Sequence, residues 1–348
     1  SSTAAIVSPA AVQKYRQKFY QNPVGTGAFM FKSWEKKKRI VLVANPNYWR
    51  GKPAIDEFVS ITSDKHEILH KLFRQEKIDI IDSVSISRTA GLKNLRWATI
   101  KLIPTLSVTF IAFNFKNKNL KKENIRKAIR FAWDPRFLKY VFQDFVVPIN
   151  SILPRGMPGY KTEMRTKNFF INKARELVEK ENITGVIKLR FLLLNDSSLE
   201  RQIVSLFSKN LKRIGIELEL ESVSREKYKK RIGSGDFDLT FSGWIADYPD
   251  PHSIISPLFN DQLQEKGFAN LSQYKDASIK AQIESIASEV NTPKRIKKVA
   301  GIIKGVYDHV LCIPIFQDTT VIVYNNKKIK HIIVSPINNI SLFDIEKK

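Results

Sequence analysis

The sequence has one cysteine in 348 residues, Cys312, and this scarcity excludes an internal disulfide framework. Cys312 lies in the apolar run VLCIPIF, so we expect a small buried side chain there. No stretch approaches the roughly 18 consecutive apolar residues that a membrane-spanning helix needs. The first residues also lack a basic segment followed by an apolar segment and a cleavage site, so no export signal is visible. Either the protein is cytoplasmic or its beginning has been removed.

Acidic residues are few compared with basic ones. The chain has 34 Asp and Glu against 58 Lys and Arg, which gives a net charge of +24. Such a charge suggests nucleic acid, an anionic membrane surface or acidic ligands as partners. The basic clusters, however, are scattered along the whole chain, and no recognisable nucleic-acid-binding module occurs. We therefore expect no nucleic acid partner, and a basic nucleic-acid-binding protein stays as an alternative.

The residue sets of common catalytic sites are incomplete. No GxSxG motif occurs, which leaves a serine nucleophile without support. His66, Glu67 and His70, in HEILH, fit the HExxH pattern of zinc hydrolases. A catalytic zinc needs a third protein ligand, yet neither Glu nor His occurs between Glu76 and Glu123. We expect no metal site and no catalytic residues, with a zinc-dependent hydrolase as the second alternative.

The length of the chain favours two domains, because a single core stops growing below this size. Up to about residue 106 the pattern predicts mainly strands, with one amphipathic helix over 63–77. Beyond that point helices and strands alternate, which predicts an α/β fold with βαβ crossovers and parallel strand pairs. The last apolar strand, 313–325, is interrupted by polar residues and is expected to return to the sheet of the first domain.

The most informative segment is DFDLTFSGWIADYPDP, residues 236–251. It predicts a strand that ends near Gly243 and Trp244 and is followed by Asp247. Ligand sites of α/β sheets lie outside the carboxyl ends of strands, so an acid and an aromatic residue here would face a ligand. In the other interpretation, Asp247 caps the following turn or the helix predicted over 253–259.

This segment also carries a resemblance to a known family. GWIADYPDP resembles the signature loop of the family 5 solute-binding proteins, the periplasmic oligopeptide- and dipeptide-binding group. Four further segments resemble family motifs in the same order: NPVGTGAFMFKSW, VANPNYWRGKP, RQEKIDIID and FIAFNFKNKNLKKENIRKAIRFAWD. Five ordered segments make the resemblance specific.

The resemblance implies a periplasmic-binding-protein-like bilobal fold (type II, cluster C) with an incomplete first lobe. Residues 1–110 and 319–348 would form lobe I, and 111–318 would form lobe II. Members of the family are longer, so we expect this chain to lack the signal peptide, the opening strands of lobe I and a small extra domain.

The implied function is that of the substrate-binding component of a peptide ABC importer. It would capture oligopeptides in a cleft between the lobes, as a monomer that is not an enzyme and needs no cofactor, and its partners would be membrane permease subunits. The location would be periplasmic or at the cell surface, with a membrane-anchored lipoprotein as one form. Within the family, the alternative ligands are a nickel chelate, haem or a sugar.

The resemblance also implies roles for particular residues. Asp247 matches the aspartate that holds the α-ammonium of the peptide. Gly243 and Ile245 match positions whose main chain pairs with the extended peptide. Trp244 matches the tryptophan of the signature loop.

Two further positions, Phe110 and Ile111, lie where cleft-lining aromatic or apolar residues are found in the family. One departure concerns the arginines that oligopeptide binders carry shortly before the loop. Here the corresponding positions hold Ile232 and Phe241, so the resemblance names no residue for the peptide carboxylate.

Overall fold

The computed structural model describes residues 5–82, 84, 86–160, 169–195, 198–260, 272, 274–337 and 339–348. The chain divides into two compact units. Unit 1 contains Ser1–Ile103 and Thr320–Lys348, and unit 2 contains Pro104–Thr319. The lobe boundaries expected from the sequence, 110/111 and 318/319, stay a prediction about the lobes of the family fold.

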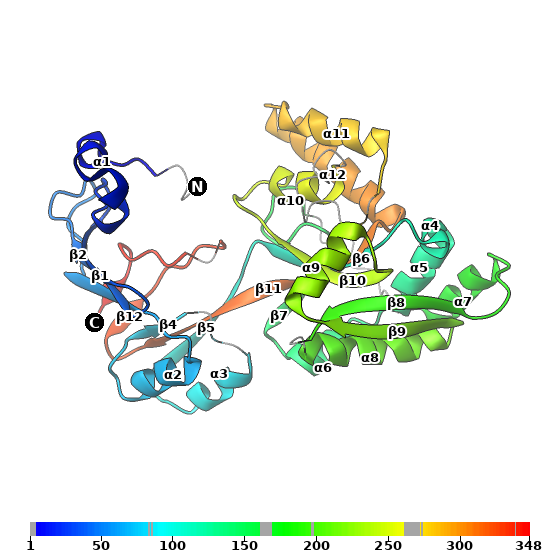
Figure 1. Cartoon of the computed structure of the whole chain (residues 1–348), viewed down its shortest axis with the longest axis horizontal. Coiled ribbons are helices and arrows are strands. Elements are labelled where there is room, and N and C mark those ends of the chain that lie inside the picture. The colour runs from blue at the N-terminus through cyan, green and yellow to red at the C-terminus, as the bar shows by residue number, and fades with distance from the viewer. Residues whose placement is uncertain are drawn as a thin grey trace. The chain divides into compact units, whose positions relative to one another are not determined.

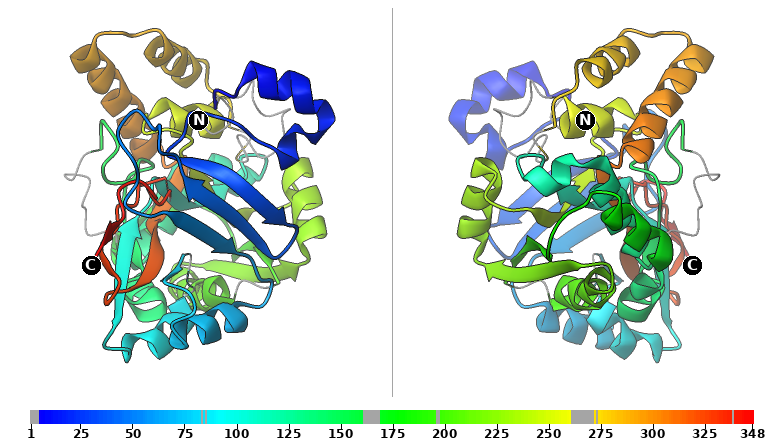
Figure 2. Two further views of the ribbon diagram at one scale, coloured as in Figure 1. Left: turned by 90° about the vertical axis from the view of Figure 1, so that its left-hand side faces the viewer. Right: turned by 90° about the vertical axis from the view of Figure 1, so that its right-hand side faces the viewer.

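Unit 1 is built around short antiparallel strands. Strands β1, β2 and β3 form a three-stranded antiparallel sheet in that order (Figures 1 and 2). A separate apolar cluster joins the end of β11 to β12. The elements are α1 Pro9–Tyr15, the 3-10 helix η2 Arg16–Gln21, β1 Phe29–Glu35, β2 Arg39–Ala44, β3 Glu57–Ile61, α2 His66–Arg74, β4 Ile80–Ile81, α3 Ile86–Lys93, β5 Ala98–Pro104, β12 Ile329–His331 and β13 Glu346–Lys347. The sheet leaves several large apolar side chains exposed: Met30, Trp34, Ile40, Val59 and Ile61.

Unit 2 contains the alternating part of the chain. Its elements are β6 Ser107–Phe113, α4 Lys118–Lys121, α5 Glu123–Ala132, α6 Arg136–Phe142, β7 Val146–Pro148, α7 Ile171–Glu179, β8 Ile187–Leu194, α8 Ser198–Lys212, β9 Ile216–Val223, α9 Arg225–Ser234, β10 Leu239–Ile245, α10 His252–Phe259, α11 Ala277–Ala287, α12 Thr292–Asp308 and the first part of β11 Cys312–Asn325. The strand order is β11-β6-β10-β8-β9, and β7 pairs with β11. The pairs β8–β9 and β10–β8 are parallel, which confirms the prediction of parallel strands.

Strand β11 contributes to both units. Its first part pairs with β6 and β7 in unit 2, and Val323 and Tyr324 pair with β4 in unit 1. The predicted return of the last strand to the sheet of the first domain is therefore confirmed.

Helices cover both faces of the unit 2 sheet. Figure 1 shows α6 and α8 on one side of the strands and α10, α11 and α12 on the other. On the first side, Phe191 of β8 packs against Phe241 of β10, with ring centroids 5.2 Å apart. On the second side, Val108 and Phe110 of β6 join the apolar residues of α10, α11 and α12 in the main core cluster of unit 2. This double coverage explains why β6 is apolar at nearly every position.

Local sequence fixes the ends of the helices around β10. The Ser224 hydroxyl accepts a hydrogen bond from the backbone N–H of Lys227 at the start of α9. The same helix ends at Gly235, whose φ of 71° lies in the left-handed region that glycine adopts without strain. Asn291 caps α12 by accepting from the N–H of Lys294. The Gly235 cap ends α9 just before β10, and the Asn291 cap starts α12, the helix that precedes β11.

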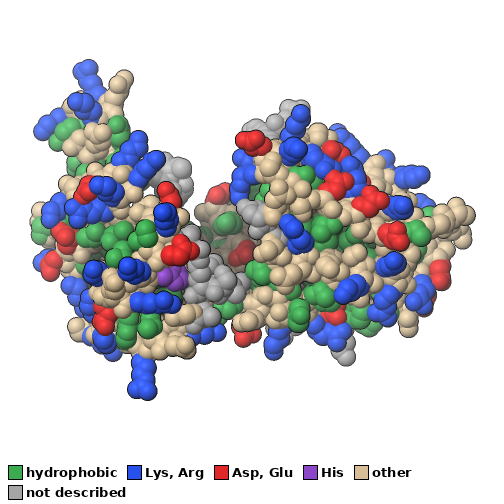
Figure 3. Space-filling model, turned by 60° about the horizontal axis from the view of Figure 1, so that its bottom comes forward, with side chains coloured by type: hydrophobic (Ala, Val, Ile, Leu, Met, Phe, Trp, Pro, Cys, Tyr) green, Lys and Arg blue, Asp and Glu red, His purple; other side chains and the backbone are tan. Residues whose placement is uncertain are grey.

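Among the described residues, no helix is both long and apolar enough to cross a lipid bilayer. On the face drawn in Figure 3, Lys and Arg side chains are spread over the surface and mixed with Asp and Glu.

Candidate functional site

The site is built on β10, which lies between β6 and β8. Two main-chain hydrogen bonds fix the orientation of this strand: Ala246 N donates to Leu106 O (2.8 Å), and Asn114 N donates to Asp238 O (2.9 Å). In an antiparallel pair, successive residues turn their main-chain groups to alternate sides. The even-numbered residues of β10 therefore turn toward β6, and the odd-numbered residues turn away from it.

The side of β10 away from β6 is only partly occupied. Strand β8 pairs with β10 at Leu239 and Thr240 and no further. Within the part of the chain that the structure describes, no strand pairs with this side beyond Thr240. The main-chain N–H and C=O groups of Gly243 and Ile245 therefore face an open edge. This edge lies at the carboxyl ends of β8 and β10, where α/β sheets place their ligands.

A tyrosine marks where the open edge begins. The Tyr228 hydroxyl, from α9, donates to the carbonyl oxygen of Phe241 at 2.9 Å. Burial raises the pKa of this hydroxyl, so it stays a neutral donor. The next odd positions are accessible: Gly243 is exposed, and 67% of Ile245 is exposed. An extended chain can thus approach the edge from Gly243 onward.

The two aspartates of the loop after β10 have different environments. Asp250 Oδ1 accepts from the N–H of His252 at 2.8 Å, at the start of α10. The Asp250 carboxylate also pairs with both terminal nitrogens of Arg295, at 2.6 and 2.9 Å. Burial raises the pKa of Asp250, but the hydrogen bonds from Arg295 and His252 outweigh it and leave the pKa below its usual value. The capping role considered for Asp247 therefore belongs to Asp250.

Asp247 itself is exposed and has no hydrogen-bond or ion-pair partner among the described residues. It lies two residues beyond Ile245, at the end of the open edge. An exposed carboxylate next to unpaired main-chain groups can receive a positively charged group of a ligand.

Trp244 supports the loop from the other face of β10. Its indole Nε1 donates to the carbonyl oxygen of Ser253 at 2.7 Å, and its ring packs half-buried against the core of unit 2. The tryptophan therefore ties the end of β10 to α10, which holds the loop containing Asp247.

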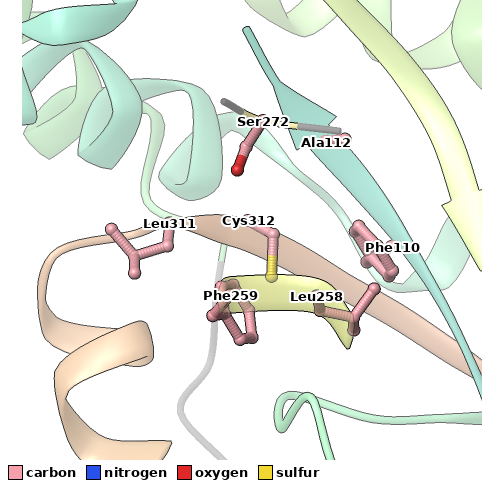
Figure 4. A pocket seen from close by; sticks show the side chains of 7 residues that line it. All are labelled: Phe110, Ala112, Leu258, Phe259, Ser272, Leu311 and Cys312. Atoms are coloured by element: carbon pink, nitrogen blue, oxygen red, sulfur yellow. The ribbon is translucent and has the colours of Figure 1, made fainter. Parts of the chain in front are cut away.

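Phe110 and Ile111 contribute to packing. They are 5% and 0% exposed, so neither side chain offers surface to a ligand in this structure. Phe110 lines a small, mostly apolar pocket inside unit 2 (Figure 4). The other residues around this pocket are Ala112, Leu258, Phe259, Ser272, Leu311 and Cys312. Both residues were expected to line a cleft, but here they are buried. They are buried because helices cover both faces of β6.

The HEILH motif lies on α2, in unit 1. Glu67 is exposed and His70 is half-buried, while the side chain of His66 lies outside the described residues. Across the described ranges, no group of three or more His, Cys, Asp or Glu side chains is placed to hold a metal ion.

Comparison with known proteins assigns the family. Residues 1–265 match the bacterial extracellular solute-binding proteins, family 5 Middle. The chain belongs to this family. The prediction from the five ordered motifs is therefore confirmed, and family 5 consists of solute-binding proteins by its own description.

Curated relatives are identical to this chain at about a quarter of the aligned residues. The probable D,D-dipeptide-binding periplasmic protein DdpA of Escherichia coli (strain K12) is 25% identical over 343 residues, which cover 96% of this chain and 65% of that protein. Two other relatives, a probable di/tripeptide-binding protein and a dipeptide-binding protein, are covered to 58% and 61% of their lengths. This chain thus spans about three fifths of the length of these relatives. Relatives named for haem and for nickel also match, at 24% and 23% identity.

Solved structures show the same fold. HbpA2 from Haemophilus parasuis matches with a TM-score of 0.87 and 20% identity, covering 100% of this chain and 69% of that one. The periplasmic binding protein DppA from Helicobacter pylori, in complex with the peptide STSA, matches with a TM-score of 0.74 and 20% identity, covering 98% and 68%. These matches confirm the predicted α/β fold class of the periplasmic binding proteins.

Proposed function

We propose that this chain is the substrate-binding component of a peptide ABC importer and that it binds extended oligopeptides along the open edge of β10. The observation that carries the proposal is the edge itself. Gly243 and Ile245 turn main-chain groups outward that have no partner among the described residues, and Asp247, which has none among them either, lies two residues after Ile245.

The chemistry of the edge fits a peptide. A bound chain adds a strand to an exposed sheet edge, and its affinity comes from main-chain hydrogen bonds that do not depend on side chains. A free peptide amine has a pKa near 8 and is charged at neutral pH. The carboxylate of Asp247 can hold this ammonium through a charge-assisted hydrogen bond.

The names of relatives support the proposed location and the proposed transporter partners. Two are named as peptide-binding periplasmic proteins, and one as a probable ABC transporter periplasmic-binding protein. We infer that this protein works in the periplasm or at the cell surface and delivers its ligand to membrane permease subunits. Units 1 and 2 would be the two lobes of the family fold, and a ligand would favour the closed form by binding it more tightly.

Native mass spectrometry of the purified chain tests the function. We expect co-purified peptides with free amino termini. Co-purified haem, a nickel chelate or a sugar would contradict the peptide assignment and favour the corresponding branch of the family.

A pair of variants links that ligand to the edge. Ile245→Pro removes an N–H that turns away from β6, so it leaves the ladder between β10 and β6 intact. We expect this variant to fold and to lose the co-purified peptide. The matched variant Ile245→Val keeps the N–H and should retain the peptide. Equal peptide occupancy in the two variants would show that the ligand does not pair with this edge.

A further inference from the structure

A second carboxylate, Asp318 of β11, lies in unit 2 near the proposed site. Its Oδ2 accepts a hydrogen bond from the Ser107 hydroxyl at 2.8 Å, and its backbone N–H donates to the same hydroxyl at 3.1 Å. The side chain of Thr109 is a further hydrogen-bond partner of the carboxyl group. Among the described residues, neither Lys nor Arg forms an ion pair with Asp318. The residue is partly buried but keeps some exposure to solvent.

A carboxylate in this position is costly to keep charged. Burial raises the pKa of Asp318, and the hydroxyl hydrogen bonds only partly oppose that effect. Hydroxyl groups donate hydrogen bonds but supply no positive charge. The environment of Asp318 therefore suits a carboxylate whose positively charged partner is supplied by a ligand.

Strand register places Asp318 on the same sheet face as the open edge. On β6, Thr109 lies opposite Gly243 of β10, and Ser107 lies opposite Ile245. Phe316 of β11 pairs with Thr109, and Asp318, two residues further, points to the same face. Strands β11, β6 and β10 lie side by side in that order.

On this face of the sheet, one position between Asp318 and the open edge carries no side chain. Gly243 has no side chain, and among the described residues a Cβ built there would have only Val108 O and Thr109 Oγ1 within 4 Å, at 3.2 and 3.6 Å. A residue of the bound chain opposite Gly243 would put its side chain on this same face. Neighbouring strands are about 4.8 Å apart, so the main chain of that residue lies about 10 Å from β6 and about 14 Å from β11. The Asp318 carboxylate reaches from β11 toward β6, where it accepts hydrogen bonds from the Ser107 and Thr109 hydroxyls. Only a long side chain crosses such a distance toward the carboxylate.

We propose that Asp318 is a specificity-determining residue that binds the Lys or Arg side chain of the peptide residue paired beside Gly243. The inference rests on the proposed function and deepens it by naming the ligand class, peptides with a basic residue at one fixed position. Asp247 receives the peptide amine, and Asp318 receives the basic side chain.

Calorimetry with a set of synthetic tetrapeptides tests the role of Asp318. In tetra-alanine, one residue is replaced by arginine or by its uncharged analogue citrulline, at each position in turn. The readout is the ratio of the two affinities at each position. We expect the unmutated chain to prefer arginine by about tenfold or more at one position. Asp318→Asn should bring this ratio close to one.

A control variant separates the local effect from the change in net charge. Asp308→Asn removes one negative charge from the end of α12, where Asp308 pairs with Lys304, and it should keep the arginine preference. The ratio is insensitive to misfolding, since a general loss of binding affects both peptides alike. No preference in the unmutated chain, or the same preference in Asp318→Asn, would overturn the role of Asp318. Failure of every tetrapeptide to bind would contradict the proposed function itself.

Discussion

Replacing Asp250 by asparagine isolates the ion pair that holds the loop after β10. The carboxylate pairs with two nitrogens of Arg295, and the two side chains are 29% and 22% exposed. This environment is intermediate between a surface pair, worth 0–1 kcal/mol, and a buried pair, whose disruption costs about 3–5 kcal/mol. We expect Asp250→Asn to lower the free energy of unfolding by about 2 kcal/mol at pH 7.

The effect has a defined pH dependence. The pKa of Asp250 is lowered in the folded state. The carboxylate therefore stabilises the fold at any pH above its unfolded pKa, which is about 4, and this stabilisation is lost as the pH falls through the lower folded pKa. The unmutated chain and the variant should differ fully at pH 7 and converge in stability below about pH 4.

Urea unfolding followed by circular dichroism measures both effects. Asp247→Asn is the matched control, because it makes the same substitution three residues earlier at an exposed carboxylate without a described partner. It should change the free energy of unfolding by less than about 0.5 kcal/mol. A neutral Asp250→Asn, or an equal cost of the two substitutions, would contradict a stabilising role for this ion pair.

Three further predictions concern the interior of unit 2. Trp244→Phe removes the hydrogen bond to Ser253 and should cost about 1 kcal/mol of stability in urea unfolding, whereas a neutral result would mean that the bond contributes nothing. Phe110→Ala should cost about 3–5 kcal/mol, as for a buried core ring, and a stable variant with weakened ligand binding would restore this residue to the site. Burial raises the pKa of the Cys312 thiol, so iodoacetamide should label it only in urea, and rapid labelling of the folded chain would contradict its burial.

Much of the fold could be predicted because the chain alternates helices and strands with clear periodicity. The segment 124–143, interpreted as a long helix or a helix pair, forms α5 and α6, which are separated before Pro135. The short elements were missed. Helix α3, Ile86–Lys93, has a weakly amphipathic pattern, and β5, Ala98–Pro104, is mostly half-buried and does not alternate cleanly. Their pairing depends on contacts with distant segments, which local sequence does not encode.

The site could be predicted only in part. The strand end and its aspartate follow from the sequence of β10, but the open edge follows from the point where β8 stops pairing with it. Local sequence left open whether Asp247 faces a ligand or caps the following turn, because the partner that holds Asp250 at the start of α10, Arg295, lies 45 residues away from Asp250. The burial of Phe110 was missed although β6 is almost wholly apolar. The one sequence feature that pointed to Asp318 was the polar interruption of the apolar strand β11.

We propose that Asp247 holds the free amine of a bound peptide, and calorimetry tests this contact most directly. Calorimetry would compare the unmutated chain and Asp247→Asn, each with tetra-alanine and with its N-acetylated form. Either change alone should weaken binding by about 2–5 kcal/mol, the range for breaking a desolvated charge pair. The two changes together should cost hardly more than one, because each removes the same contact. Additive losses would show that the carboxylate and the amine do not meet, and would contradict the account.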